Sequence, residues 1–193
     1  MPLGEYTKNQ VREMARKLKL RIAAKEESQE LCFVADDNYK RFLRDRVPEK
    51  IHEGEIVDKY GTVLGTHQGV PFYTIGQRRG LGIPAGSPLY VTQVNAENNS
   101  IVVGRPKDLL QSTMQVERIN LIALEQFDEP IRAHVKIRSR DEGASATIYP
   151  QSEAEAMVQF DEPRRAITPG QATVFYDKDL VIGGGWIKSC KRG

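Results

Sequence analysis

The sequence lacks the features that would place it in a membrane or in an oxidising compartment. No apolar run approaches the roughly 20 residues that a membrane-spanning helix needs, and no basic segment followed by an apolar one opens the chain. Only two cysteines occur among 193 residues, Cys32 and Cys190, which are too few for a disulfide scaffold and lack the paired spacing of a structural zinc site. We therefore predict a soluble, cytoplasmic protein without a membrane partner.

An excess of charge of one sign is also lacking. Lysine and arginine number 28 and the acidic residues 26, so the formal net charge is only +2. Total charge alone therefore does not indicate a nucleic-acid partner, and the argument must come from where the cations lie. The three histidines, His52, His67 and His134, show no metal-ligand spacing. We expect each to be a hydrogen-bonding loop or strand residue, and we predict no metal site.

Helical signals are confined to the first part of the chain. Thr7 and Gln10 form a capping-box pattern, in which each side chain bonds the other residue's backbone N–H. Apolar residues then recur at helical spacing at Val11, Met14, Ala15 and Leu18. A second short helix is expected around residues 39–43.

From about residue 52 the sequence carries short strand signals separated by glycine and proline. The predicted strands cover residues 55–57, 62–64, 89–94, 101–103, 119–124, 131–138, 144–149, 154–160, 173–176 and 181–187. The first four form two hairpins. The near-regular spacing of the others is typical of a small closed barrel or sandwich. The fold class is therefore mainly β with a short α-helical N-terminal segment.

The strand predicted at residues 131–138 is the first candidate for a functional surface. Its apolar face would carry Ile131, Ala133, Val135 and Ile137, and its polar face Arg132, His134, Lys136 and Arg138. On this pattern alone, a solvated strand whose charges pair with nearby acids is the simpler interpretation. In the functional interpretation, Lys136, Arg138 and Arg140 bind phosphates, and Arg164 and Arg165 extend the same positive surface.

A glycine-rich stretch at residues 73–82 is the second candidate. Small residues let a backbone approach closely, and the forked donors of Arg78 and Arg79, next to Gln77, suit phosphates. The alternative is a tight loop with two surface arginines. The glycine spacing matches neither a Walker A loop nor a dinucleotide-binding fingerprint.

Cys32 is the third candidate, because it lies between a charged segment and apolar residues. A lone cysteine in this setting is usually a small buried hydrophobic residue. A reactive role would require access and a lowered thiol pKa, from a nearby cation or helix N-terminus. Cys190, among basic residues near the end of the sequence, is assigned no role.

Several sequence runs together resemble the bacterial tRNA-specific 2-thiouridylases. The most specific are the run from Tyr73 to Gly82 and the run from Ser28 to Phe33, which occur in the family's order. The others are Pro2-Leu3-Gly4, Thr7-Lys8, Val11-Arg12, Lys25, Gly54-Glu55-Ile56-Val57-Asp58, Pro169-Gly170-Gln171-Ala172 and Gly183-Gly184-Gly185-Trp186-Ile187. The family often has aspartate where this chain has Glu27, a departure that leaves the assignment of Cys32 intact.

The resemblance implies an enzyme that makes 2-thiouridine at the wobble position of tRNA. It implies ATP, with magnesium, as the cofactor that adenylates the uridine, and a cysteine persulfide as the sulfur source. Two cysteines share the work, transiently forming a disulfide, and Cys32 matches the one thought to carry the persulfide. The implied partners are tRNA and a sulfur-relay protein that donates the persulfide. Gln77, Arg78, Arg79, Lys136, Arg138 and Arg140 become candidate tRNA contacts.

One family feature, the Ser-Gly-Gly-Xaa-Asp-Ser-type pyrophosphate loop, does not occur in this sequence. The resemblance then implies the tail of a catalytic domain at 1–45, a central tRNA-contacting domain at 46–113 and a C-terminal six-stranded-type β-barrel at 114–193. Such a fragment is expected to be inactive alone and to bind no ATP. Two alternatives remain open at this point: a non-enzymatic RNA-binding barrel module with Cys32 in its core, and a β-rich interaction domain that binds no RNA.

Overall fold

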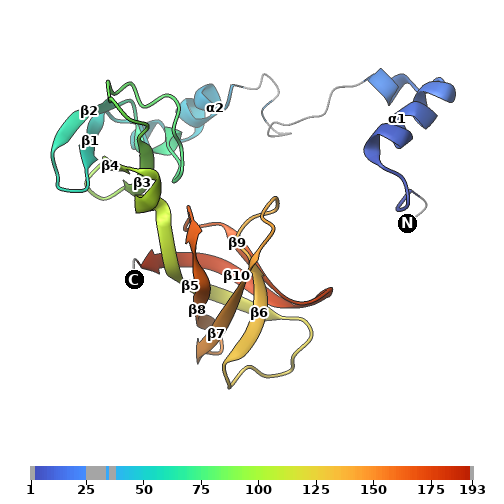
Figure 1. Cartoon of the computed structure of the whole chain (residues 1–193). Coiled ribbons are helices and arrows are strands. Elements are labelled where there is room, and N and C mark those ends of the chain that lie inside the picture. The colour runs from blue at the N-terminus through green and yellow to red at the C-terminus, as the bar shows by residue number, and fades with distance from the viewer. Residues whose placement is uncertain (1–2, 25–33, 35–37, 192–193) are drawn as a thin grey trace. The chain divides into compact units, whose positions relative to one another are not determined.

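The computed structural model describes residues 3–24, 34 and 38–191 (Figure 1). The chain divides into two compact units, Met1–Arg46 and Val47–Gly193. Each unit is described by itself. The predicted site residue Cys32 lies outside the described residues.

The first unit contains both predicted helices. Helix α1 (Lys8–Lys17) begins at the expected capping box: the Thr7 backbone N–H donates to Gln10 Oε1 at 2.8 Å, and the Gln10 N–H donates to Thr7 Oγ1 at 3.4 Å. A 3₁₀ turn, η1 (Arg21–Ala24), follows. Helix α2 (Tyr39–Arg46) is preceded by Asn38, whose Oδ1 accepts the Arg41 N–H at 3.0 Å. The local sequence therefore specifies both helix starts.

The second unit opens with the 3₁₀ turn η2 (Pro48–Lys50) and a four-stranded sheet of order β2-β1-β4-β3. Its strands are β1 (Gly54–Asp58), β2 (Val63–His67), β3 (Tyr90–Asn95) and β4 (Ser100–Gly104), and two further 3₁₀ turns are η3 (Val70–Phe72) and η4 (Pro106–Leu109). Both predicted hairpins are present as antiparallel pairs, and β1 joins β4 in parallel. One face of the sheet packs a small core of Ile56, Leu81, Val91, Ile101 and Val103.

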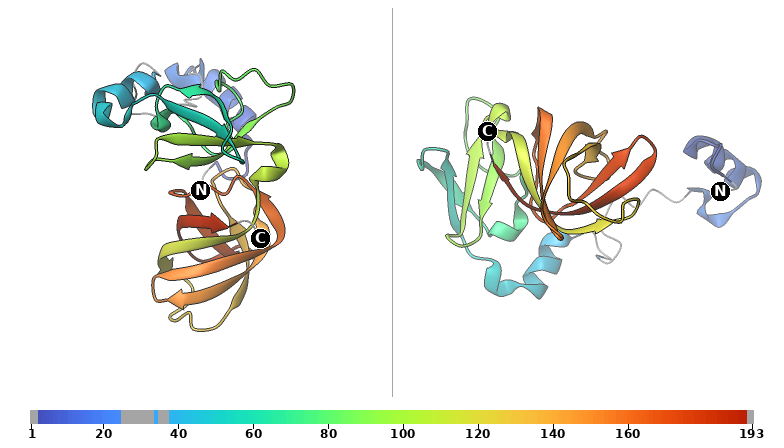
Figure 2. Two further views of the ribbon diagram at one scale, coloured as in Figure 1. Left: turned by 90° about the vertical axis from the view of Figure 1, so that its left-hand side faces the viewer. Right: turned by 90° about the horizontal axis from the view of Figure 1, so that it is seen from below.

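The remaining strands close into a six-stranded barrel of order β10-β5-β8-β7-β6-β9 (Figure 2). They are β5 (Leu110–Leu121), β6 (Ile131–Lys136), β7 (Ala144–Ser152), β8 (Glu155–Arg165), β9 (Ala172–Asp177) and β10 (Leu180–Lys191). The mainly β fold class and the C-terminal barrel are confirmed. Closure removes the exposed edges that an open sandwich would leave.

Several strand boundaries differ from the sequence prediction, including those of β5 and β6. The strand expected at residues 119–124 is β5, which begins at Leu110 and carries the chain directly from the sheet into the barrel (Figure 1). The basic strand ends at Lys136, so Arg138 and Arg140 lie beyond it in a turn. Its alternation is as predicted, because Ala133 and Val135 are buried in the barrel core while Arg132 and His134 are exposed.

Three consecutive glycines in β10 allow close strand packing at one side of the barrel. A Cβ on Gly183 would lie 2.6 Å from the Asn120 carbonyl oxygen, and one on Gly184 would collide with the Thr173 carbonyl oxygen. Because these neighbours are backbone atoms of adjacent strands, a side chain cannot be accommodated by a rotamer change.

We expect Gly184→Ala to destabilise the protein by about 2–3 kcal/mol, since the barrel strands must move apart. Chemical denaturation followed by the fluorescence of Trp186, the only tryptophan, measures this change. Gly86→Ala is the matched control, because a Cβ there meets no atom within 4 Å. Equal midpoints for the two variants would contradict the packing argument.

Candidate nucleic-acid interface

The arginine loop, residues 73–82, is braced against strand β3. The Gly76 N–H donates to the Val91 carbonyl at 2.8 Å, and the Val91 N–H donates to the Gln77 carbonyl at 2.9 Å. The Gln77 side chain accepts the Thr74 N–H at 3.1 Å and donates to the Arg79 carbonyl at 2.9 Å. Gln77 therefore shapes the loop, and both ends of its amide are used within it.

Arg78 and Arg79 are exposed at the tip of this loop. Arg78 also borders a hollow of about 590 Å³ whose other lining residues, 80–89, are mostly small or apolar. Neither arginine forms an ion pair with a residue that the structure describes. Two unneutralised guanidinium groups beside small residues form a surface that a phosphate backbone can approach closely.

The basic strand β6 is neutralised over its first half. Both terminal nitrogens of Arg132 bond the Asp161 carboxylate at 2.6 Å, and Nη1 also donates to Thr147 Oγ1 at 3.1 Å. These hydrogen bonds hold the pKa of the Asp161 carboxyl below its usual value. His134 Nε2 lies 2.8 Å from the Glu142 carbonyl oxygen. The simpler interpretation, a strand whose charges pair with nearby acids, is correct for Arg132.

The second half of the basic surface is more open. The Lys136 ammonium lies 5.5 Å from the centre of the Tyr176 ring, a cation–π contact that leaves its charge unneutralised. Arg138 and Arg140 are exposed in the turn that follows β6. This turn closes with a hydrogen bond of 3.1 Å from the Asp141 N–H to the Arg138 carbonyl.

The Asp141 side chain holds this turn through two contacts. Its carboxylate is buried, accepts the Ile137 N–H at 3.1 Å and bonds Arg164 Nη2 at 2.5 Å. The expectation that Arg164 extends the positive surface is therefore wrong, because its charge is used in a largely buried ion pair. The Arg165 guanidinium lies over the Tyr90 ring at 4.7 Å, so it links the barrel to the sheet.

The structure brings the arginine loop and the Arg138–Arg140 turn to the same end of the barrel. Both border the last residues of β8: Arg164 bonds the turn through Asp141, and a Cβ at Gly76 would lie 3.1 Å from that of Ala166. The Ala166 N–H also donates to the Leu109 carbonyl at 3.0 Å. The two segments are thus both anchored near the end of β8, a relation that their spacing along the sequence does not reveal.

The other predicted polar residues do not join this surface. Cys190 is half-buried in β10, with Sγ 3.6 Å from the Ile167 carbonyl oxygen. His67 is buried and bonds the Asn99 carbonyl and the Gly69 N–H, and His52 bonds the Glu49 carbonyl at 2.7 Å. The histidines are hydrogen-bonding residues, as predicted. No group of three or more metal-ligand side chains occurs among the described residues.

The glycine-rich stretch at residues 73–82 lacks the structural context of a phosphate-binding loop. The glycine-rich stretch runs from η3 directly into strand β3, so no helix N-terminus follows it to receive phosphates. Within the described ranges, no helix is both long and apolar enough to cross a membrane.

Three family models match consecutive segments of the chain. Residues 1–36 match the model described as tRNA methyl transferase HUP domain, and residues 40–105 match the tRNA methyl transferase PRC-barrel domain. Residues 111–187, which hold most of the closed barrel, match the aminomethyltransferase beta-barrel domain.

Curated relatives align with nearly the whole chain. The tRNA-specific 2-thiouridylase MnmA of Acetivibrio thermocellus is 44% identical over 188 residues, which are 97% of this chain and 52% of the relative. The protein of that name from Lachnoclostridium phytofermentans is 46% identical over 187 residues, again 97% and 52%, and that of Halothermothrix orenii is 45% identical over 188 residues, with the same coverage. The chain spans about half the length of these relatives. The chain is therefore similar to the C-terminal part of the tRNA-specific 2-thiouridylases.

Proposed function

We propose that this chain is the tRNA-holding, cysteine-bearing part of an enzyme that makes 2-thiouridine at the wobble position of tRNA. The observation that carries the proposal is the alignment of 97% of the chain with relatives named tRNA-specific 2-thiouridylase. In this proposal residues 1–45 are the tail of the catalytic domain. Residues 46–113 are a central tRNA-contacting domain, and residues 114–193 are the barrel domain.

The tRNA backbone binds the arginine loop and the Arg138–Arg140 turn, which are both anchored near the end of β8. Arg78, Arg79, Arg138 and Arg140 are all exposed, and none forms an ion pair with another described residue. Lys136 adds a charge that only an aromatic ring contacts. Guanidinium groups bind phosphate oxygens through two parallel hydrogen bonds, so this arrangement suits a backbone that passes across the barrel end.

Cys32 carries the sulfur. A sulfur-relay protein transfers the terminal sulfur of its persulfide to the Cys32 thiol, which becomes a persulfide. The terminal sulfur of Cys32 then attacks C2 of a uridine whose C2 oxygen has been made a leaving group. The second cysteine of the pair, which is not Cys190, attacks Cys32 Sγ and breaks its bond to the sulfur on C2. The sulfur stays on the nucleoside, and the two cysteines form a disulfide that a reductant reopens. The reducing interior of a cell supplies that reductant.

Activation of the uridine is assigned to residues beyond this sequence. ATP with magnesium performs it in the longer protein of which we propose this chain is a part. We expect the 193-residue chain alone to bind tRNA without forming 2-thiouridine.

Replacing both loop arginines tests the proposed tRNA surface. We expect Arg78→Gln with Arg79→Gln to weaken tRNA binding at least roughly tenfold and to reduce the slope of log affinity against log salt by about 2, because two phosphate contacts are lost. Titration of labelled tRNA at several salt concentrations measures both quantities.

Arg132→Gln is the matched control for this test. It removes one positive charge from the same unit, but that charge is already neutralised by Asp161. An unchanged salt slope in the Arg78/Arg79 variant, or an equal loss in the control, would exclude the arginine loop as a phosphate site.

A further inference from the structure

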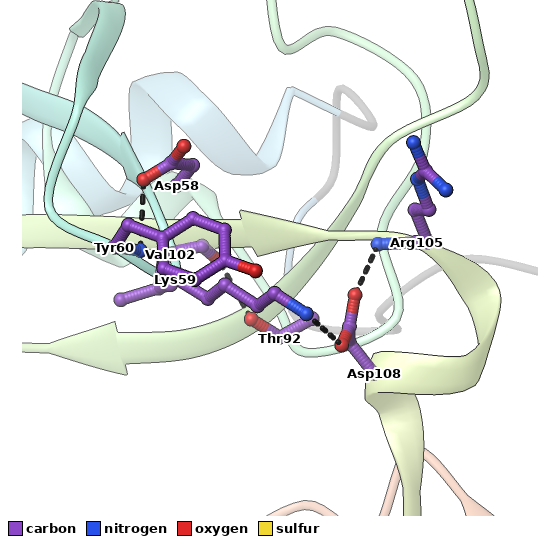
Figure 3. Close-up of polar contacts among 7 residues, drawn as sticks. All are labelled: Asp58, Lys59, Tyr60, Thr92, Val102, Arg105 and Asp108. Atoms are coloured by element: carbon purple, nitrogen blue, oxygen red, sulfur yellow. Dashed lines mark hydrogen bonds and ion pairs between the residues drawn. The ribbon is translucent and has the colours of Figure 1, made fainter.

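The tip of the β1–β2 hairpin carries the most exposed large hydrophobic side chain among the described residues. Tyr60 is 82% exposed, whereas the next, Leu18, is 71% exposed. Its ring lies beside the Lys59 side chain, whose ammonium is 5.3 Å from the ring centre (Figure 3). An aromatic ring held in solvent next to a cation offers a face on which another planar group can stack.

A second segment contributes two cations to the hollow beside this ring. Arg105 and Lys107 are exposed where β4 leads into η4, and with Tyr60 and Lys59 they line a hollow of about 430 Å³. Neither forms an ion pair with any residue in the described ranges. The volume lies within the range of pockets that hold small organic groups.

The two acidic residues that line the hollow, Asp58 and Asp108, form hydrogen bonds with neighbouring protein groups. Asp58 Oδ1 accepts the Tyr60 N–H at 2.8 Å and the Thr62 N–H at 2.9 Å, which fixes the hairpin turn. Asp108 accepts the Arg105 N–H at 2.8 Å and bonds the Lys59 ammonium at 3.4 Å, which ties the hairpin to η4 (Figure 3). These contacts connect the hairpin turn to η4, and the charges of Arg105 and Lys107 stay available to a ligand.

We propose that this hollow, the hairpin-tip site, binds one unpaired nucleotide of an RNA strand. The base stacks on the Tyr60 ring, and the flanking phosphates contact Arg105 and Lys107. Stacking on an aromatic side chain combined with cations along the backbone is how proteins hold single-stranded RNA without reading its sequence. The inference rests on the proposed function in that the RNA would be the tRNA already held by the arginine loop.

An unpaired nucleotide suits the hollow better than a helical segment does. A-form RNA presents phosphates and sugar hydroxyls but keeps its bases stacked inside, so a duplex has no free base face for Tyr60. Loops and ends of tRNA do expose such faces. The hairpin-tip site would therefore add a preference for unpaired RNA to the sequence-independent phosphate binding of the arginine loop.

Binding of a labelled single-stranded RNA octamer and of tRNA to the 193-residue chain tests the site. We expect Tyr60→Ala to weaken octamer binding roughly tenfold, in line with the loss of one stacked base, and Tyr60→Phe to bind within about twofold of the natural chain. Arg105→Gln should lower the salt slope by about 1. Lys178→Gln, in the exposed turn between β9 and β10, is the control and should leave octamer binding unchanged.

The outcomes separate this inference from the proposed function. The hairpin-tip site alone would be overturned by two results together. Tyr60→Ala would bind the octamer and tRNA as well as the natural chain does, while the Arg78/Arg79 substitutions would still weaken tRNA binding. Failure of the natural chain to bind tRNA at low salt would overturn the proposed function. Competition by a mononucleotide as effective as the octamer would overturn the assignment to an RNA strand, because no contact beyond one free nucleotide would then contribute. Fluorescence of Trp186 confirms that each variant is folded.

Discussion

Cys32→Ser is expected to abolish 2-thiouridine formation by the complete protein that contains this chain, while tRNA binding stays unchanged. Serine keeps the approximate size of the side chain, but its hydroxyl cannot hold a terminal sulfur. The loss should therefore appear in the chemical step and not in affinity. Single-turnover thiolation, measured beside tRNA binding on the same preparation, separates the two.

Cys190→Ser is the control for this experiment, because it replaces the only other cysteine of the sequence. The Cys190 thiol is half-buried and makes a weak contact of 3.6 Å to the Ile167 carbonyl, which a hydroxyl can also make. We expect thiolation near the normal rate. Normal thiolation by Cys32→Ser would refute the assignment of the persulfide to Cys32 and would favour the alternative of an RNA-binding module with a structural cysteine.

Asp141→Ala is expected to destabilise the chain by about 3 kcal/mol, the largest loss of folding stability that we predict. The Asp141 side chain is only 6% exposed, and its removal leaves the Arg164 guanidinium, 24% exposed, without its counter-charge. The buried Ile137 N–H loses its acceptor as well. Chemical denaturation followed by Trp186 fluorescence measures the change.

A second substitution shows whether the ion pair is the cause. Combining Asp141→Ala with Arg164→Met removes the uncompensated charge, so the double variant should be more stable than Asp141→Ala alone. Asp161→Ala, which breaks an exposed pair with Arg132, should cost less than about 1 kcal/mol. A double variant no more stable than Asp141→Ala would show that the carboxylate acts through the turn and not through Arg164.

The local sequence specified the parts of the fold in which pattern and packing agree. Thr7 and Gln10 make the predicted capping box, and the alternation of the basic strand buries Ala133 and Val135 as expected. The predicted strand at residues 119–124 covers only the end of β5, because the first half of β5 does not show the alternation of an amphipathic strand. One of its buried positions is Gln111, a polar residue that the barrel covers despite its amide.

Which arginines of the candidate site carry an unneutralised charge depends on pairing between residues far apart in the sequence. The sequence pattern does not predict those pairs. Arg132 is neutralised by Asp161, 29 positions away, across the intervening strand β7. Arg164 is similarly paired with Asp141, 23 positions away, at the end of the barrel. Arg78 and Arg79 remain exposed because they lie at the tip of a loop whose inner contacts are made by Gln77. Only the register of the strands distinguishes a structural arginine from one that is available to a ligand.

The proposed thiolation is tested by mass spectrometry of the nucleosides of an unmodified tRNA after incubation with the complete protein, ATP and a persulfide donor. We expect sulfur to replace oxygen at the wobble uridine, and the 193-residue chain alone to leave the tRNA unchanged. Two of the matching family models are described as methyl transferase domains, so the same spectra also report a methyl group if one is added. A methylated or unaltered wobble uridine after incubation with the complete protein would refute the proposed sulfur transfer.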